Sequence, residues 1–317
     1  MDNEKMSPQG DMGAAAVKGT KKANVISLVT RFFIALLAVS LIMLGFTYVK
    51  NNFLDSDITW SLSEKGELTI KGEGAIEALD PLSPSEWLDL ESGKKVKSVV
   101  ISKGITSIGD YAFYKCQYIE SVIIADTVTE IGDFAFQGCT KLKKVVVPEK
   151  VTAIGEGAFY GCAELGAITL PKGLCRIGYD AFYGTACYKS DSVWSGGAMY
   201  IDGHLVCADK EFEGVLDIKE GTLSVADCAF SGCGAVSEVN MPDSVKSVGA
   251  YAFQNCDGLE SVRLSDSLSL LPEGLFHGCK RLTTVSYGGS GKADAGFRKG
   301  GSDFSVVGKD GKVREGF

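Results

Sequence analysis

The sequence predicts a solenoid of stacked coils, made of short parallel β-strands and irregular segments, because one pattern recurs at a fixed spacing. Seven units of 23 residues follow one another, with one interruption, and an Ala-Phe or Leu-Phe pair marks the same place in each. These pairs stand at 112–113, 135–136, 158–159, 181–182, 229–230, 252–253 and 275–276. Such a period is typical of repeat proteins, whose units bury their apolar faces only by stacking.

The start of each unit predicts a strand with one buried face. Its second and fourth residues are apolar in all seven units, and this alternation is the signature of a half-buried strand. The pairs are Val99/Ile101, Val122/Ile124, Val145/Val147, Ile168/Leu170, Leu216/Ile218, Val239/Met241 and Val262/Leu264. The residue between each pair is therefore expected to face solvent.

The second part of each unit predicts a turn and a packing layer. A glycine follows an apolar residue at Gly109, Gly132, Gly155, Gly178 and Gly249, where we expect a left-handed or crowded turn. The small and large residues of the Ala-Phe pair would then let successive layers interlock.

One repeated motif resembles a known family. Ile-Gly, two variable residues, Ala-Phe, two more residues, Cys and then Leu recur over residues 98–283 and resemble the BspA-type (bacterial surface-antigen) leucine-rich repeats. The stretch from Trp60 resembles the module that often precedes such repeats. The chain departs from the ordinary leucine-rich repeat, in which Asn or Cys follows the strand, because Cys139 precedes the strand at 145–147. The resemblance implies a leucine-rich repeat solenoid used for surface interaction or adhesion, not for catalysis.

The N-terminal region predicts a membrane anchor. Residues 1–24 are predicted to be a disordered cytoplasmic tail. Residues 25–49 are predicted to be a transmembrane signal-anchor helix, with 18 uncharged residues from 32 to 49 and Arg31 near one end. The positive charges before this segment place the N-terminus in the cytoplasm and the repeats outside the cell, in a single-pass topology. A cleaved signal peptide is the alternative, which the length of the apolar run disfavours.

Three segments flank or interrupt the repeats. Residues 50–97 predict a linker and an N-terminal β cap that contains a hairpin of 60–63 with 67–70. The insert 190–214 contains Asp202-Gly203 between apolar triplets, a type I′ hairpin signal, so that a hairpin either protrudes or replaces one coil. The pattern fails after Leu282, and residues 284–317 are predicted to be a C-terminal cap and a glycine-rich tail.

Charge limits the classes of partner. Residues 1–50 hold six Lys or Arg and three Asp or Glu, or +3, and the remaining 26 basic and 37 acidic residues give −11. A strongly acidic outer region disfavours nucleic acid and anionic membrane surfaces as partners. The sequence does not indicate the oligomeric state.

The cysteines divide into two groups. Six occupy one repeat column, in which Thr185 replaces Cys in the fourth unit, so we interpret that column as buried small side chains. Cys175, Cys187, Cys207 and Cys228 cluster around the insert, where one or two disulfides are a hypothesis whose pairing cannot be read from sequence.

No residue pattern indicates an enzyme. His204 and Cys207 have no second pair of metal ligands at a suitable spacing, and no phosphate-binding glycine loop or activated nucleophile is present. We therefore expect no catalytic residue, no metal and no cofactor.

The solvent-facing strand positions predict where a partner binds. In the first four units this column reads Val100, Ile123, Val146 and Thr169, whereas in the last three it reads Asp217, Asn240 and Arg263. A contiguous exposed apolar patch marks an interaction site more often than scattered apolar residues do. Lys144 and the hairpin around Asp202 are candidate rims of that patch.

Two functions fit this sequence. The favoured one is a membrane-anchored cell-surface protein that binds an extracellular protein or glycan. The alternative is a structural or accessory scaffold of the cell envelope without a specific ligand.

Overall fold

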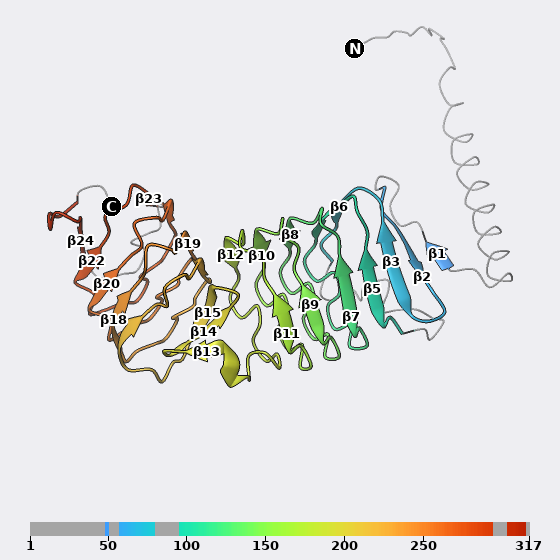
Figure 1. Cartoon of the computed structure of the whole chain (residues 1–317), viewed down its shortest axis with the longest axis horizontal. Helices are drawn as coiled ribbons and strands as arrows, with labels where there is room; N and C mark the ends of the chain where they lie inside the picture. Colours follow the sequence, from blue (N-terminus) through green and yellow to red (C-terminus); the bar gives the residue numbers. More distant parts are fainter. Residues whose placement is uncertain (1–47, 51–56, 80–94, 294–302, 315–317) are drawn as a thin grey trace, which may run out of the picture. The chain divides into compact units, whose positions relative to one another are not determined.

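The computed structural model describes residues 48–50, 57–79, 95–293 and 303–314 (Figure 1). The chain divides into two units, Met1–Val49 and Lys50–Phe317. The predicted tail and most of the predicted membrane helix lie outside the described residues. Tyr48–Lys50 is strand β1, so the predicted helix is wrong at Tyr48 and Val49, which are residue types that favour extended backbone. Within the described ranges, no helix is long and apolar enough to cross a bilayer.

The second unit begins with the predicted hairpin, which opens the first sheet. Thr59–Leu62 (β2) pairs antiparallel with Glu67–Lys71 (β3), with Trp60 opposite Ile70. Strand β3 then pairs in parallel with β5 of the first repeat, so the hairpin covers the first coil. Further strands join in the order β3-β5-β7-β9-β11. Their bounds are Ser98–Ile101 (β5), Ser121–Ile124 (β7), Lys144–Val146 (β9) and Ala167–Thr169 (β11).

A second parallel sheet collects one more short strand from each coil. Its order is β12-β10-β8-β6-β4, and its members stack in register, as Ile131, Ile154 and Ile177 show. Their bounds are Gly74–Ile76 (β4), Ile105–Ile108 (β6), Glu130–Ile131 (β8), Ala153–Ile154 (β10) and Arg176–Ile177 (β12). Each regular coil thus contributes a strand to both sheets (Figure 1).

The insert replaces a coil in the stack. A 3-10 turn at Asp191–Val193 leads into Trp194–Ser195 (β13), Ala198–Ile201 (β14) and His204–Ala208 (β15). Strands β14 and β15 form the predicted hairpin, and positive φ angles of 47° at Asp202 and 86° at Gly203 fit a type I′ turn. Strand β15 then pairs in parallel with the next coil, where His204 lies opposite Ser224.

The solenoid resumes after the insert with two further sheets. Strands β13-β14-β15-β17-β19 form one and β16-β18-β20-β22-β24 the other, while β21 pairs with β23. The bounds are Gly214–Asp217 (β16), Ser224–Val225 (β17), Val236–Asn240 (β18), Ser247–Val248 (β19), Ser261–Arg263 (β20), Leu270–Leu271 (β21), Thr284–Ser286 (β22), Lys292–Ala293 (β23) and Ser305–Val307 (β24).

Regular pairing continues beyond residue 283, where the sequence pattern fails. Val285 and Tyr287 are fully buried, and β24 pairs with β22 in parallel register. The Tyr287 hydroxyl donates a hydrogen bond to Leu268 O and accepts one from Gly291 N–H. A tyrosine therefore closes this end of the core, and strands β22, β23 and β24 continue the sheets into the segment predicted to be a C-terminal cap and tail.

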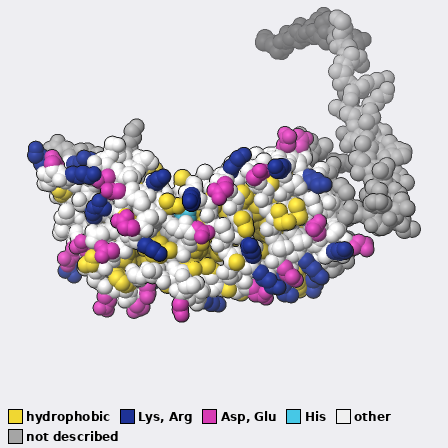
Figure 2. All heavy atoms as spheres, viewed as in Figure 1, with side chains coloured by type: hydrophobic (Ala, Val, Ile, Leu, Met, Phe, Trp, Pro, Cys, Tyr) yellow, Lys and Arg dark blue, Asp and Glu magenta, His cyan; other side chains and the backbone are white. Residues whose placement is uncertain are grey.

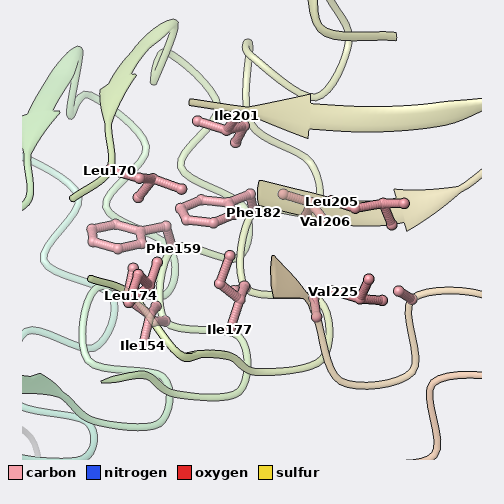
Figure 3. Close-up of a cluster of buried hydrophobic side chains, with 14 of the residues drawn as sticks. Ile154, Phe159, Leu170, Leu174, Ile177, Phe182, Ile201, Leu205, Val206 and Val225 are labelled. Atoms are coloured by element: carbon pink, nitrogen blue, oxygen red, sulfur yellow. The ribbon is translucent and has the colours of Figure 1, made fainter. Parts of the chain in front are cut away.

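The core contains two columns of stacked aromatic rings, separated by an aliphatic layer from the insert. Phe113, Phe136, Phe159 and Phe182 stack with centroids 5.0 to 5.7 Å apart, and all four are fully buried. Ile201, Leu205 and Val206 of the insert occupy the next layer beside Phe182 (Figure 3). A second stack of Phe230, Phe253 and Phe276 follows it.

The repeated glycine is required by crowding and not by a left-handed backbone. A side chain at Gly132 would meet Asp110 Oδ1 at 2.4 Å and Asp110 N at 2.7 Å, and Gly155 is confined in the same way. The left-handed residues come two positions later, with φ of 59° at Tyr111 and 55° at Phe134. The crowding half of the sequence prediction is confirmed, and its left-handed half is wrong.

The cysteine column places a thiol against the backbone of the preceding coil. Cys139 Sγ lies 3.3 Å from Phe113 O and Cys162 Sγ 3.1 Å from Phe136 O. Thr185, which replaces Cys in the fourth unit, instead donates its hydroxyl to Phe182 O of its own coil at 2.9 Å. The column therefore combines burial of a small side chain with a weak donor, a role that both Cys and Thr can fill.

Candidate binding surfaces

Four solvent-facing residues lie side by side on the first sheet, and we call them the apolar stripe: Val100, Ile123, Val146 and Thr169. Val100 pairs with Ile123 and Val146 with Thr169, and the parallel register of Ser121 with Lys144 sets Ile123 beside Val146. Ile123 is 63% exposed and Val146 51%, whereas Val100 is half-buried. The structure thus brings together the four residues that the sequence suggests.

Strand geometry explains why this face can be apolar at no cost to the core. Val122 and Val145 point inward between the exposed residues and are buried against the phenylalanine column. Neighbouring strands lie about 4.8 Å apart, so the four residues span roughly 14 Å along the sheet. Figure 2 shows apolar side chains gathered over β5, β7 and β9 on this face.

A cluster of lysines borders the apolar stripe. Lys144 begins β9, and the exposed residues Lys97, Lys141 and Lys143 also lie just before β5 or β9 in the chain. Figure 2 shows Lys and Arg side chains below the apolar residues. Lys144 is the member that sequence reasoning suggests; the others were missed, although they recur one and three residues before a strand. We call these four residues the basic rim.

A lysine pair flanks Tyr118 beside this rim. Lys95 Nζ lies 4.0 Å from the centroid of the Tyr118 ring, and Lys141 Nζ lies 5.5 Å from it. The hydrogen bond and positive charge of Lys95 lower the pKa of the Tyr118 hydroxyl. This part of the surface is therefore locally basic although the region beyond residue 50 is strongly acidic.

The other predicted rim, the hairpin at Asp202, is tied to the fourth coil. Asp202 Oδ2 accepts a hydrogen bond from Leu170 N at 2.8 Å. His204 Nε2 lies 3.1 Å from Pro171 O and Nδ1 lies 2.7 Å from Ser224 Oγ. Because a carbonyl can only accept, Nε2 carries the proton and Nδ1 accepts from the serine. Burial lowers the pKa of His204, which the Pro171 carbonyl only partly offsets.

The cysteines around the insert are not bridged. Cys175, Cys187, Cys207 and Cys228 are all free thiols, so the disulfide hypothesis finds no bond in the structure. Burial raises the pKa of Cys207 to about 12 and that of Cys228 to about 11, so both remain protonated near neutral pH. Within the described parts of the chain, no group of three or more His, Cys, Asp or Glu side chains could hold a metal ion.

Three solved structures illustrate what this chain is similar to. A leucine-rich repeat protein from Eubacterium ventriosum is 22% identical, with a TM-score of 0.39, and the match covers 83% of this chain and 85% of that one. A leucine rich cell surface protein from Faecalibacterium prausnitzii is 24% identical, with a TM-score of 0.33 and coverage of 81% and 89%. The pneumococcal vaccine antigen PcpA is 14% identical, with a TM-score of 0.33 and coverage of 84% and 94%.

The family assignment rests on the repeats themselves. The comparison with curated proteins found no match. The BspA type Leucine rich repeat region matches in six copies, over residues 91–195 and 210–292, which is more than half of the chain. The gap between these ranges contains the hairpin of β14 and β15. The chain therefore belongs to the BspA-type leucine-rich repeat family.

Proposed function

We propose that this protein is a non-catalytic, membrane-anchored cell-surface protein whose solenoid binds another protein outside the cell. The exposed Ile123 and Val146 in the middle of a regular sheet carry this proposal. The core does not require apolar side chains at these positions, because the same repeat elsewhere accepts Asp, Asn and Arg there. A bound partner would remove them from water.

The chemistry of the surface favours a protein partner with an acidic border. Burying the apolar stripe supplies the hydrophobic centre of an interface, and the basic rim offers charged groups at its edge. A partner with apolar side chains flanked by Asp or Glu would complement both features. Neutral glycans are less suited to this stripe because Ile and Val offer neither a ring face for stacking nor hydrogen-bonding groups.

Membrane anchoring is the second part of the proposal. Its support is the uncharged run from 32 to 49 and the excess of lysines before it. Full-length protein should sediment with membranes and resist carbonate extraction, and external protease should remove the repeats from intact cells. A mature N-terminus beyond residue 45 would indicate a cleaved signal peptide instead.

Binding is tested with the full-length protein in detergent against a panel of extracellular matrix proteins and glycans. We expect saturable binding to a protein that decreases at least tenfold in the double variant Ile123→Asp, Val146→Asp. The matched control Ser286→Asp, at the corresponding exposed position of β22 beside Arg263, should bind normally. Equal binding by the double variant contradicts the assignment of the stripe. If no panel member binds saturably, the envelope-scaffold alternative is favoured.

A further inference from the structure

A cavity of about 560 Å³ opens where the insert meets the regular coils. Residues from the fourth coil, the insert and the fifth unit line it, among them Asp180, Tyr183, Tyr188, Trp194, Lys210 and Asp227. We call it the junction cavity. Its volume is that of a small-molecule site, and no residue of the apolar stripe lines it.

The cavity arises because the insert changes how successive coils are joined. In the regular stack, Gly157 N–H bonds to Tyr179 O and Phe159 N–H to Ala181 O, one coil to the next. The same ladder resumes after the insert with Cys228 N–H to Ala250 O. Between the two ladders, the insert contributes Ala208, whose N–H bonds to Ala229 O. The cavity lies where the backbone hydrogen bonds between regular coils give way to the bond from Ala208 of the insert to Ala229.

Aromatic rings form one wall of the junction cavity. Tyr183 stacks on Tyr160 with centroids 5.4 Å apart and meets Tyr188 at 5.1 Å and 56°. Tyr188 in turn lies edge-on to Trp194 at 5.7 Å, and Trp194 Nε1 donates to Tyr188 O at 3.0 Å. Tyr183 remains 45% exposed. The rings are thus held in place by one another while their surface stays accessible from the cavity.

Carboxylates outnumber cations around the same space. Asp180, Asp209, Glu211 and Asp227 line the cavity, whereas Lys210 is the single basic residue in its lining. Asp227 is paired, because Arg176 Nε lies 3.0 Å from its Oδ2. Counting Arg176 with Lys210 leaves an excess of two negative charges. The excess lies beside π-systems, whose faces also attract cations.

The carboxylate of Asp180 acts on ionisable groups nearby. The charge of Asp180 is the largest cause of the raised pKa of Tyr179. Burial first, and then Asp180, raises the pKa of Cys207 to about 12, and Asp180 also contributes to the raised pKa of Tyr188. Burial raises the pKa of Asp180, and the hydrogen bond with Tyr179 and the charge of Lys210 only partly offset this.

We propose that the junction cavity binds an organic cation, namely the ammonium or guanidinium group of a small amine or of a Lys or Arg side chain in a peptide. The tyrosine and tryptophan wall and the carboxylates converge on one space, and together they favour a positively charged guest with an apolar stem. A neutral saccharide would use the rings but not the excess negative charge. The site is independent of the stripe and does not rest on the proposed function.

The test is calorimetric titration of the full-length protein with four probes: butylammonium, the peptide Gly-Lys-Gly-Arg-Gly, the same peptide with Gln at both basic positions, and maltotriose. We expect the basic peptide to bind and the Gln peptide to bind at least tenfold more weakly. Binding of butylammonium as well identifies a site for free amines, whereas binding of the peptide alone identifies a site for basic side chains. The quenching of Trp194 emission should accompany binding.

Two variants with matched controls locate the site. Asp180→Asn removes the charge and keeps a residue type that tolerates the left-handed φ of 54°, and it should weaken binding at least tenfold. Tyr183→Ala should weaken binding similarly. The controls are Asp126→Asn, an exposed carboxylate near Lys103, and Tyr114→Ala, in the same repeat column as Tyr183, and both should bind within twofold of the unaltered protein.

Several results would overturn the proposal. These are equal binding of the basic and Gln peptides, unchanged binding by Asp180→Asn, stronger binding of maltotriose than of either cation, and no binding of either cationic probe. Melting temperatures of the variants distinguish loss of the site from loss of the fold, and the conservative Asp180→Asn change keeps the test valid if Tyr183→Ala unfolds.

Discussion

The two halves of the solenoid have the same inner face and different outer faces. Between the insert and the C-terminus, the outward side chains bind one another: Asn240 Nδ2 donates to Asp217 Oδ1 at 2.9 Å and to Glu238 Oε1 at 3.0 Å. Arg263 pairs with Asp243 at 3.2 Å. On the N-terminal side, the corresponding column exposes Ile123 and Val146. The inner residues of both halves are apolar, and all are buried except Ile124 and Ile168, which are partly buried.

This difference shows that the fold requires apolar residues at the inner strand positions but permits either apolar or polar residues at the outer ones. Inner positions must fill the space around the phenylalanine column, so they stay apolar in every coil. Outer positions touch only solvent and their neighbours along the sheet, so their chemistry is free to vary. The fold therefore requires the apolar core but not the apolar stripe, which is why the stripe carries the proposed binding role.

The largest expected effect tests the shared inner face. Phe159→Ala and Phe253→Ala should each destabilise the protein by about 3–5 kcal/mol, because each ring is fully buried between two others. Tyr160→Ala, at the next residue, should cost roughly 1 kcal/mol or less because that ring is only half-buried. Chemical denaturation measures all three, and equal losses for Phe159→Ala and Tyr160→Ala would contradict the assigned layers.

A smaller effect is expected from changing the outer face. Ile123→Asp should cost about 1 kcal/mol or less, the range that strand propensity spans, because the side chain is already in water. Ser286→Asp, at the corresponding exposed position of β22 beside Arg263, should cost no more than Ile123→Asp. Thermal denaturation of both variants checks this expectation. A loss near that of Phe159→Ala would place Ile123 in the core.

Histidine protonation should distinguish the insert from the regular coils. Burial lowers the pKa of His204 below its usual 6.5, so the unfolded chain binds this proton more readily than the folded one. The stability that neutral His204 contributes is fully present above pH 6.5 and decreases as pH falls below it. The melting temperature should therefore decrease between pH 7.5 and 6.0, and His204→Gln should flatten that decrease. An equal slope in the variant would assign the effect to other groups.

The smallest expected effect concerns the polar half of the outer face. Asn240→Ala removes two hydrogen bonds, but both are made at the solvent-facing surface, where water replaces them. We expect a loss of about 0.5 kcal/mol or less in denaturant unfolding. A loss above about 2 kcal/mol would mean that these bonds hold the strands together and are not merely a way of satisfying exposed polar groups.

The sequence by itself determined the repeat, its phase and its interruption. Repeats of 23 residues with alternating apolar residues bury those residues by stacking as coils. The inward position of Val122 and Val145 and the outward position of Ile123 could therefore be predicted without a structure. The hairpin at Asp202-Gly203 could also be predicted, because this residue pair favours the two successive positive φ angles of a type I′ turn.

Only the tertiary structure decided the features that depend on contacts between coils. The crowding at Gly132 comes from Asp110, 22 residues earlier, and the lysines around Tyr118 meet across neighbouring coils. Tyr287 continues the core although its segment lacks the repeat motif. Its ring is buried, and its hydroxyl donates a hydrogen bond to Leu268 O of the preceding coil. The junction cavity exists because the insert shifts the bonding between layers, and no local pattern encodes such a shift.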